Sequence, residues 1–324
     1  MTAVLGFDVG GTHSRARLVR DNALAAEATA PSASLTAAGR ERAAEALKSL
    51  LAELGLRTGD NDPSSGLSGW PSGEEPLDAV CIGTAGTGAA EPEAFLVGFL
   101  APFTKGGNVT VVNDARLVLA AAGVEDGIAC VAGTGSIAVG IVDGHEERAG
   151  GWGYLLGDEG SGYWIVREAV RELTCRQDSH ASPGALGHAL LGASGYADVT
   201  SLWQGWYDHP SPDGWAALAP VVLDCDDAFG EAVCTSGALA LAATICEVYK
   251  RLGKPPDLPV VLAGGLLTQH HGLAAATRQA LGSQAPRARV MVATEPPVAG
   301  AVRLALAAAR AHAQEVPRDP SPRQ

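Results

Sequence analysis

Residues 3–20 (AVLGFDVGGTHSRARLVR) are an apolar run, 3–9, and a second strand-like pattern, 15–20, joined by a turn of Gly10, Gly11 and Thr12. Glycines between two strand patterns mark a tight turn, so this stretch predicts a β-hairpin. Residues 127–142 (GIACVAGTGSIAVGIV) repeat the pattern later in the chain. A repeated hairpin indicates a duplicated α/β chain whose two lobes face each other across a cleft.

The rest of the chain alternates between helical and strand-like patterns, as α/β chains do. The segment after the first hairpin carries leucines at helical spacing and stops at Gly55, a residue suited to a helix C-terminus. Short apolar runs that end at small or polar residues predict buried strands, and open α/β sheets bind ligands at the carboxyl ends of such strands. We expect helices at 38–54, 159–173, 236–252 and 298–312, and strands at 78–83, 109–113 and 258–263.

These patterns divide the 324 residues into four parts. The N-terminal lobe covers 1–114 and includes a surface loop at 57–76, rich in Gly, Ser and Pro, to which we assign no chemistry. The C-terminal lobe covers 115–296. An Ala-rich helix, 297–313, is expected to pack back toward the N-terminal lobe, and the tail 314–324 is expected to be disordered.

Charge and terminal sequence restrict the classes of partner. The formal net charge of −13 argues against nucleic-acid and anionic-membrane partners, since both require a basic face. The N-terminal sequence MTAVLGFDVGG has none of the features of a signal peptide, and we expect no apolar run long enough to cross a membrane. The sequence therefore predicts a cytoplasmic protein without nucleic-acid or membrane partners.

The six cysteines contain no CxxC pair, so we interpret them as reduced structural thiols rather than zinc ligands or disulfide partners. The histidines form no HExxH motif. His270 and His271 follow a strand and turn, and we expect them on a surface loop rather than at a metal site.

The first glycine turn has the composition of a phosphate-binding loop. Backbone N–H groups of Gly10 and Gly11 can approach a phosphate closely, Thr12 and Ser14 offer hydroxyls, and Asp8 can hold Mg²⁺. A plain hairpin turn explains this stretch equally well when it is taken alone.

A second turn with the same chemistry strengthens the phosphate hypothesis. Gly133, Thr134, Gly135 and Ser136 stand at the matching point of the second hairpin. Two such turns imply a polyphosphate ligand, while the absence of GxxxxGK[ST] and of a helix-opening GxGxxG argues against P-loop and Rossmann proteins.

Asp114 is the candidate general base. It follows the strand-like run that ends at Asn113, and a carboxylate at a strand end can accept a proton from an alcohol that attacks phosphorus. Asp114 can equally cap the following helix, and both roles can hold at once.

Residues 150–162 (GGWGYLLGDEGSG) form an unusually glycine-dense stretch with two aromatic and two acidic residues. A rigid binding loop fits this composition better than a flexible linker, because Trp and Leu favour burial. Asp158 can accept hydrogen bonds from sugar hydroxyls, and Trp152 either shapes the pocket wall or packs in the core. Gly264 and Gly265 follow a strand and either admit a flat ligand or form a plain turn.

The order of these motifs resembles the actin-like and sugar-kinase ATPase superfamily, with its two phosphate segments, connect segment and adenosine segment. More narrowly, the chain is similar to the N-acetylglucosamine kinase and BadF/BadG-type ATPase family, and within it to the actinobacterial glucosamine kinases. The resemblance runs from Val4 to about Ala308, and its most specific stretch is 150–165 (GGWGYLLGDEGSGYWI). It implies a two-lobed, duplicated actin-like (ribonuclease H-like) ATPase fold.

The resemblance also implies roles for individual residues. Asp114 becomes the catalytic base, and Asp8 becomes the Mg²⁺ ligand, directly or through water. The turn that begins at Gly83 and includes Ala85 and Gly86 would line the cleft. The implied sugar-binding residues are Asn113, Ser136, Gly151, Trp152, Asp158, Gly83 and Thr84, and the implied ATP-binding residues are Gly10, Gly11, Thr12, Gly133, Thr134, Gly135, Gly264 and Gly265.

Two features of related families are missing. The cysteine-rich zinc motif of ROK kinases is absent, and so are the clustered cysteines that hold an iron–sulfur cluster in BadF-type reductase activators. A zinc-bearing glucokinase and an electron-transfer ATPase are therefore disfavoured.

The activity implied by the resemblance is ATP- and Mg²⁺-dependent phosphorylation of the 6-hydroxyl of D-glucosamine, which yields glucosamine 6-phosphate and ADP. N-acetylglucosamine is the alternative substrate: the ammonium of glucosamine would favour a nearby carboxylate, whereas an acetyl methyl group needs a small apolar pocket. A sugar-independent ATPase switch or regulator of the same fold is the third reading. Homodimers are common among such kinases, so a homodimer is a further expectation.

Overall fold

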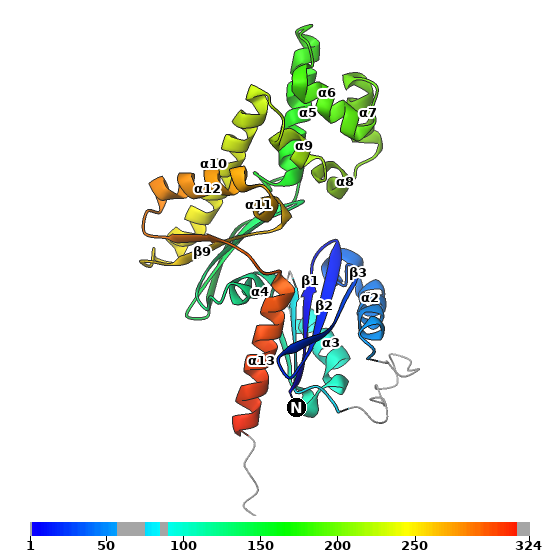
Figure 1. Cartoon of the computed structure of the whole chain (residues 1–324), viewed down its shortest axis with the longest axis vertical. Coiled ribbons are helices and arrows are strands. Elements are labelled where there is room, and N and C mark those ends of the chain that lie inside the picture. Colours follow the sequence, from blue (N-terminus) through cyan, green and yellow to red (C-terminus); the bar gives the residue numbers. More distant parts are fainter. Residues whose placement is uncertain (1, 57–74, 85–89, 316–324) are drawn as a thin grey trace, which may run out of the picture. The chain divides into compact units, whose positions relative to one another are not determined.

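The computed structural model describes residues 2–56, 75–84 and 90–315 (Figure 1). They form two compact units: Met1–Val124 with Glu295–Gln324, and Glu125–Thr294. Of the expected surface loop at 57–76, residues 57–74 lie outside the described residues, as do the turn residues Ala85 and Gly86. Of the expected tail at 314–324, residues 316–324 lie outside them, while 314 and 315 end helix α13 (Pro297–Glu315).

The first unit is built on a five-stranded mixed sheet with the order β3-β2-β1-β4-β5. The predicted hairpin is present as β1 and β2, which pair antiparallel, while β1, β4 and β5 run parallel. The strands are β1 (Ala3–Val9), β2 (His13–Arg20), β3 (Ala23–Pro31), β4 (Ala79–Thr84) and β5 (Val109–Asn113).

Helices cover both faces of this sheet, because side chains alternate along the buried central strand β1. Leu5 and Phe7 pack in the cluster that contains α2, whereas Val4 packs with α4 and α13. The helices of this unit are α1 (Leu35–Ala38), α2 (Arg40–Glu53), α3 (Ala90–Leu100), α4 (Asp114–Ala121) and α13 (Pro297–Glu315), with 3₁₀ turns at Ala101–Phe103 and Lys105–Gly107.

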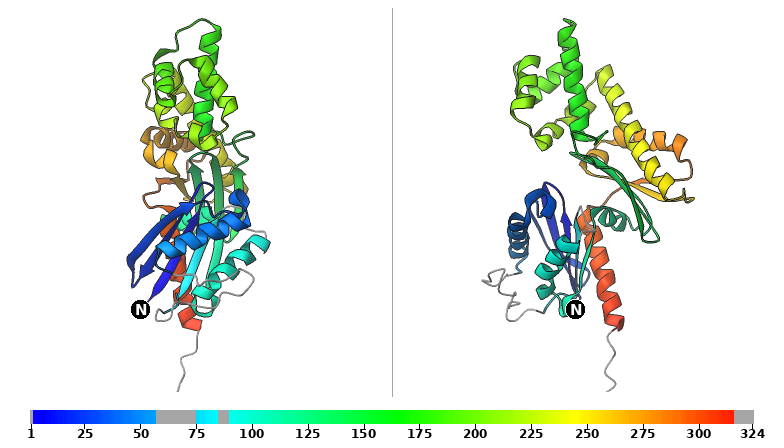
Figure 2. Two further views of the ribbon diagram at one scale, coloured as in Figure 1. Left: turned by 90° about the vertical axis from the view of Figure 1, so that its right-hand side faces the viewer. Right: turned by 180° about the vertical axis from the view of Figure 1, so that it is seen from behind.

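Helix α13 runs along β1, as Figure 2 also shows. Gly6 allows this close approach, because a Cβ atom there would lie 2.7 Å from the backbone nitrogen of Val302. Helix α13 therefore joins the first unit, although the whole second unit precedes it in the sequence.

The second unit repeats the strand order of the first. Its sheet reads β10-β9-β6-β7-β8, with β6 antiparallel to β7 and parallel to β9, so β6 corresponds to β1. The predicted duplication of an α/β unit is confirmed by this topology. The strands are β6 (Gly127–Ala132), β7 (Ser136–Val142), β8 (His145–Gly150), β9 (Pro259–Ala263) and β10 (Arg289–Val292).

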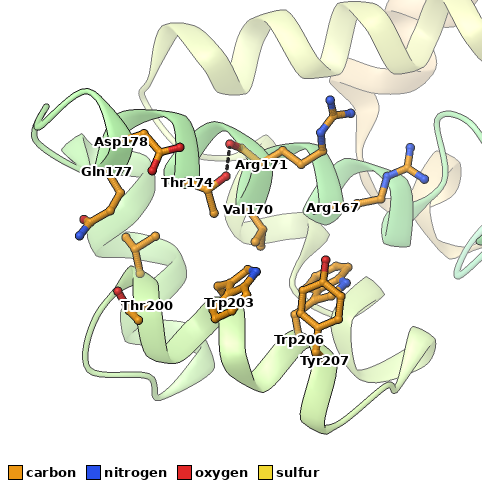
Figure 3. A pocket seen from close by; sticks show the side chains of 11 residues that line it. Arg167, Val170, Arg171, Thr174, Gln177, Asp178, Thr200, Trp203, Trp206 and Tyr207 are labelled. Carbon is orange, nitrogen blue, oxygen red and sulfur yellow. Dashed lines mark hydrogen bonds between the residues drawn. The ribbon is translucent and has the colours of Figure 1, made fainter.

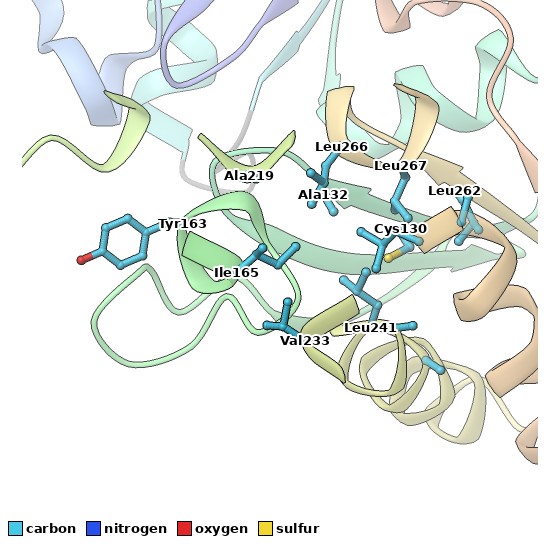
Figure 4. Packing of buried hydrophobic residues seen from close by; sticks show 14 of the residues in the cluster. Cys130, Ala132, Tyr163, Ile165, Ala219, Val233, Leu241, Leu262, Leu266 and Leu267 are labelled. Carbon is cyan, nitrogen blue, oxygen red and sulfur yellow. The ribbon is translucent and has the colours of Figure 1, made fainter. Parts of the chain in front are cut away.

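The core of the second unit lies between its sheet and helices α5 and α10, where Cys130, Ile165 and Leu241 pack together (Figure 4). The helices of this unit are α5 (Gly162–Asp178), α6 (Gly184–Ser194), α7 (Val199–Asp208), α8 (Pro212–Ala216), α9 (Ala219–Leu223), α10 (Ala228–Arg251), α11 (Gly265–Gln269) and α12 (His271–Gln284).

Helix α10 corrects the expectation that no apolar run reaches membrane-spanning length. It has 24 residues and is apolar enough to cross a bilayer by length and composition. Its buried side chains, among them Leu241 and Ile245, pack against α12 and the sheet. In this structure α10 is a core helix of the second unit.

The observed boundary between the units lies after Val124 and not after Asp114. Helix α4 follows Asp114 and packs against α13, and Arg303 Nη1 donates a hydrogen bond to the carbonyl of Ala120 at 2.9 Å. Helix α4 therefore completes the first unit rather than opening the second.

All six cysteines are free thiols, and Cys81, Cys130 and Cys246 are buried, as structural thiols would be. Burial raises the pKa of Cys81 and Cys130 to about 12, which makes both unreactive at neutral pH. Cys175 differs because it is exposed.

Candidate active site

The carboxyl ends of the three parallel strands of the first unit lie at one edge of the sheet. Val9 of β1 is the register partner of Thr84 in β4, and Thr84 is the partner of Asn113 in β5. This register brings Asp8, Thr84, Asn113 and Asp114 to the same edge. All four are residues predicted from the sequence, and the fold places them where an open α/β sheet binds its ligands.

Asp8 and Asp114 form an electrostatically coupled pair of carboxylates. Burial, followed by repulsion from Asp114, raises the pKa of Asp8 to about 6, while Arg15 opposes the rise. Burial also raises the pKa of Asp114, against backbone hydrogen bonds that lower it. Such perturbed acids at a strand edge are typical of functional sites.

Asn113, and not Asp114, is the N-cap residue of α4. The side-chain oxygen Oδ1 of Asn113 accepts a hydrogen bond from the backbone nitrogen of Ala115 at 2.9 Å. Asp114 is the first residue of the helix, and its own Oδ1 also accepts from Ala115 at 2.9 Å. The helix N-terminus thus stabilises the ionised form of Asp114 and fixes the side chain in place.

The first glycine turn is held by its neighbours. Gly10 donates its backbone N–H to the carbonyl of His13 at 3.0 Å, and Ser32 Oγ donates to the carbonyl of Gly10 at 2.8 Å. Around Gly11 there is open space, since no heavy atom lies within 4 Å of a Cβ placed there. Thr12 is exposed on the same turn.

Ser14 does not offer its hydroxyl to a ligand, contrary to the sequence expectation. It is fully buried, and its Oγ accepts a hydrogen bond from the backbone nitrogen of Ala33 at 2.8 Å. Ser14 therefore fixes the chain that follows β3. Alternation along β2 turns its side chain away from the surface.

The acids of this edge suit a hard divalent cation. Asp8 and Asp114 supply carboxylate oxygens, and Thr12 stands on the adjoining turn. Among the described residues, no three His, Cys, Asp or Glu side chains gather as a metal site. Mg²⁺ commonly takes one or two carboxylates and completes its shell with water and substrate phosphates, so the residues present fit it.

The second glycine turn is anchored on α5. Gly133 N–H donates to the carbonyl of Gly135 at 2.9 Å, and the carbonyl of Gly133 accepts from Gly162 at 2.8 Å. Thr134 Oγ1 donates to Asp213 Oδ1 at 2.7 Å. Asp213 was not predicted from the sequence, because it follows Thr134 by 79 residues and carries no motif of its own.

Asp158 is a buried carboxylate packed directly on this turn. It is 8% exposed, and its Oδ1 accepts a hydrogen bond from Gly153 at 3.2 Å. Burial is the main cause that raises its pKa. A Cβ atom at Gly135 would lie 2.5 Å from Asp158 Oδ2, so this glycine is required for the carboxylate to pack there.

Ser136 holds the glycine-rich loop, residues 150–162, through two hydrogen bonds. Its hydroxyl donates to the carbonyl of Glu159 at 2.9 Å, and its carbonyl accepts from the backbone nitrogen of Gly151 at 3.0 Å. Gly151 has a φ of 68°, which favours glycine over other residues. Ser136 and Gly151 thus hold residues 150–162 against the second turn.

Trp152 is a surface residue, which rules out core packing as its role. It is 66% exposed, and the guanidinium of Arg148 lies 5.2 Å from the centre of its ring. Leu155 and Leu156 on the same loop are also exposed. The expectation that this loop buries its Trp and Leu side chains is therefore wrong: all three are exposed.

The loop also connects to a chain of aromatic rings. Tyr154 packs edge-on against Tyr163, with ring centres 5.0 Å apart. Tyr163 in turn contacts Trp206 at 5.2 Å, and Trp206 contacts Trp215 at 4.4 Å. This chain links the glycine-rich loop to α7 and α8.

The remaining predicted glycines permit close packing. A Cβ at Gly264 would lie 2.3 Å from the carbonyl oxygen of Ala132, and Gly264 has a φ of 87°. Gly265 begins the short helix α11. At Gly83 a Cβ would lie 2.3 Å from the side chain of Leu117, so this residue lets α4 pack on the sheet.

Two curated relatives show what the chain is similar to. The N-acetyl-D-glucosamine kinase of Dictyostelium discoideum is 26% identical over 319 residues, which cover 93% of this chain and 97% of the relative. The N-acetylmuramic acid/N-acetylglucosamine kinase of Clostridium acetobutylicum is 32% identical over 175 residues. That second alignment spans 53% of each protein, about half the length of the relative.

A solved structure is similar to this chain in its fold. A candidate N-acetylglucosamine kinase from Chromobacterium violaceum matches 94% of this chain and 99% of its own, with 25% sequence identity and a TM-score of 0.66. With the two duplicated sheets, this likeness shows a two-lobed actin-like ATPase fold. The sequence profile of the BadF/BadG/BcrA/BcrD ATPase family matches residues 5–308, and the chain belongs to that family.

Proposed function

We propose that the protein is an ATP-dependent kinase of amino sugars, with N-acetylglucosamine as its substrate. One observation carries the proposal: Asp114 and Asp8 share the carboxyl edge of the first sheet, in a chain that aligns with a kinase over nearly its whole length. A carboxylate of this kind can act as base while its neighbour serves the metal.

In the proposed reaction the 6-hydroxyl of the sugar attacks the γ-phosphorus of ATP. A bond forms between the hydroxyl oxygen and the γ-phosphorus, the bond from that phosphorus to the β–γ bridging oxygen breaks, and ADP leaves. The hydroxyl proton passes to the carboxylate of Asp114, which its helix N-terminus holds in place. Mg²⁺ bound near Asp8 would neutralise phosphate charge.

The proposed binding residues are given for each unit separately. In the first unit, Gly10, Gly11 and Thr12 would bind phosphate, and Asn113, Gly83 and Thr84 would adjoin the sugar. In the second unit, Gly133, Thr134 and Gly135 would bind phosphate, while Gly264 and Gly265 would adjoin the adenosine. Asp158, Gly151, Trp152 and Ser136 would shape the sugar-binding loop.

The acetylated sugar is preferred over glucosamine because of the relatives. Both kinase relatives are named for N-acetylated sugars, and the Dictyostelium enzyme aligns over nearly all of both chains. Glucosamine, the first expectation from the sequence, gains no support from them. The comparison therefore favours the alternative substrate.

A coupled ATP-consumption assay tests the proposal with glucosamine, N-acetylglucosamine, N-acetylmuramic acid, glucose and mannose. We expect the largest kcat/KM with N-acetylglucosamine, and phosphorus NMR should identify its 6-phosphate as product. ATP hydrolysis that does not depend on any sugar would contradict a kinase and favour an ATPase switch.

The role of Asp114 needs its own variant. Asp114→Asn should lower kcat by roughly 10² to 10⁴ and leave nucleotide binding nearly unchanged. Asp226→Asn, which alters an exposed acid of the second unit, serves as the control. Near-normal turnover in Asp114→Asn would overturn the assignment of the base.

A cytoplasmic location and a homodimer complete the proposal. ATP is the phosphoryl donor, and a cytoplasmic enzyme would draw on the nucleotide pool of the cell. Multi-angle light scattering of the purified chain tests the dimer: a monomer mass at all concentrations would exclude it.

A further inference from the structure

A hollow of about 520 Å³ lies between α5 and α7 (Figure 3), and its lining includes no candidate active-site residue. Residues three and four apart on α5 line one side, among them Arg167, Val170, Arg171 and Thr174. Trp203 and Tyr207 on α7 face them with the same spacing. The hollow has the size of a small-molecule site.

The α7 side presents aromatic surface to solvent. Trp203 is 49% exposed and Tyr207 is 71% exposed, and their rings meet edge to face with centres 5.7 Å apart. The buried side chains of Val170 on α5 and Val199 on α7 add apolar surface to the lining, here called its apolar floor. Large aromatic rings exposed over such a floor would gain free energy if a ligand with an apolar face covered them.

The polar groups at the hollow cancel in charge. Arg167 and Arg171 both pair with Glu168, each at 3.0 Å, so one carboxylate already serves two guanidinium groups. Asp178 lines the other end. Two positive and two negative groups leave no net charge, which disfavours a phosphate or another small anion.

Hydrogen-bonding groups nevertheless gather at the Trp203 end of the hollow (Figure 3). Thr174, Gln177, Asp178 and Thr200 place hydroxyl, amide and carboxylate groups there, and the Thr174 hydroxyl donates to the carbonyl of Arg171 at 2.7 Å. A ligand that suits this lining is uncharged, carries many hydroxyl groups and has an apolar face of C–H bonds. Saccharides combine these properties, since the ring C–H groups stack on an aromatic plane while the hydroxyls bond to polar neighbours.

We propose that the hollow between α5 and α7 is an accessory site for a neutral saccharide, which stacks on Trp203 and Tyr207. This site is distinct from the residues assigned to phosphoryl transfer, so the proposal does not depend on the proposed reaction. The affinity should be modest, with a dissociation constant on the order of 1 mM, because the site is open and the ligand small.

Fluorine NMR of the full chain labelled with 5-fluorotryptophan tests the site. The chain has six tryptophans, and single Trp→Phe variants assign their resonances. Titration with N-acetylglucosamine, and separately with its β-1,4-linked disaccharide, should shift the Trp203 resonance in a saturable manner. The readout is binding alone, so a chain without kinase activity would still give a valid test.

Two variants sharpen the result and keep Trp203 as the reporter. Because the Tyr207 ring packs edge to face on Trp203, each variant is compared with its own saccharide-free spectrum. Tyr207→Ala and Asp178→Asn should each raise the dissociation constant measured from the Trp203 shift at least tenfold. Trp152→Phe should leave that constant unchanged. Far-ultraviolet circular dichroism confirms that each variant is folded.

Either of two results would overturn the proposal. One is a Trp203 resonance that stays in place at saccharide concentrations of tens of millimolar. The other is a Trp203 shift that follows protein concentration and not saccharide, because this would identify a second copy of the chain as the occupant.

Discussion

The hydroxyl of Thr134 donates a hydrogen bond to Oδ1 of Asp213 at 2.7 Å, so an exposed carboxylate stands beside the second glycine turn. Asp213 belongs to the short helix α8, which packs on α5. If this turn binds phosphate, as we propose, Asp213 places a negative charge next to a negatively charged ligand and engages the Thr134 hydroxyl.

Asp213→Asn should therefore tighten ATP binding. The change removes the charge and keeps the size of the side chain, and for an exposed group we expect a gain of about two- to fivefold in affinity. Equilibrium titration with a fluorescent ATP analogue measures it, and the gain should shrink as salt screens the repulsion. Asp226→Asn is the control, and unchanged or weaker binding in Asp213→Asn would contradict the prediction.

Gly135→Ala should disturb the sugar-binding loop. Its Cβ would lie 2.5 Å from Asp158 Oδ2, which must move, and overpacking of this kind costs about 1–3 kcal/mol in unfolding free energy. We expect urea denaturation to show this loss and kinetics to show a higher KM for the sugar.

Gly133→Ala is the matched control for that variant. It changes a glycine of the same turn, where no heavy atom lies within 4 Å of the added Cβ. Equal loss of stability and of sugar affinity in both variants would show that the turn responds to any side chain, and not to the contact with Asp158.

The raised pKa of Asp8 predicts a pH dependence of stability. The folded state binds the proton up to about pH 6, whereas the unfolded chain releases it near 3.8. Between these values the folded state holds more protons, so the contribution of Asp8 to stability falls as the pH rises. Over the whole interval from 3.8 to about 6, the unfolding free energy that Asp8 contributes falls by about 3 kcal/mol.

Asp8→Asn should remove this contribution. Compared with the wild type, the variant should gain unfolding free energy between pH 4 and pH 7.5, because it no longer carries a buried charge at the higher pH. Urea denaturation at several pH values measures the difference. Parallel stability profiles of the two proteins would show that Asp8 does not have a raised pKa.

Gly300→Ala should destabilise the first unit. The added Cβ would lie 1.9 Å from the carbonyl oxygen of Leu117, so α13 would have to move away from α4. We expect a loss of about 1–3 kcal/mol or more in unfolding free energy. In contrast, Gly282→Ala on the exposed side of α12 meets no neighbour and should gain up to about 1 kcal/mol. A harmless Gly300→Ala would contradict the packing of α13 described above.

The elements that the sequence predicted correctly are those with an unambiguous local pattern. The strands β1, β6 and β7 of the hairpins and the parallel strands β4, β5 and β9 are short apolar runs that end at small or polar residues, and β2 has a strand-like alternation. Strands β3 (ALAAEATAP) and β8 (HEERAG) were not predicted, because they carry exposed or charged residues and gain their order from pairing with β2 and β7.

The residues of the candidate site also divide into those with a local sequence signal and those that depend on distant contacts. Asp8 and Asp114 were found because each stands at the end of an apolar run, which is a local signal. The burial of Ser14 depends on a contact with Ala33, and the role of Asp213 depends on the packing of α8. Neither contact leaves a trace in the spacing of the residues. The boundary after Val124 was missed for a related reason, since α4 is held by a helix almost 200 residues later.

The chain of rings from Tyr154 through Tyr163 to Trp206 has an optical consequence. Tyrosine emission overlaps tryptophan absorption, so light absorbed by these two phenol rings can reappear as indole emission from Trp206. A displacement of Tyr154 would uncouple the first donor and change that sensitised signal. The protein thus carries its own spectroscopic probe of the loop that holds Asp158, and no dye needs to be attached to follow it.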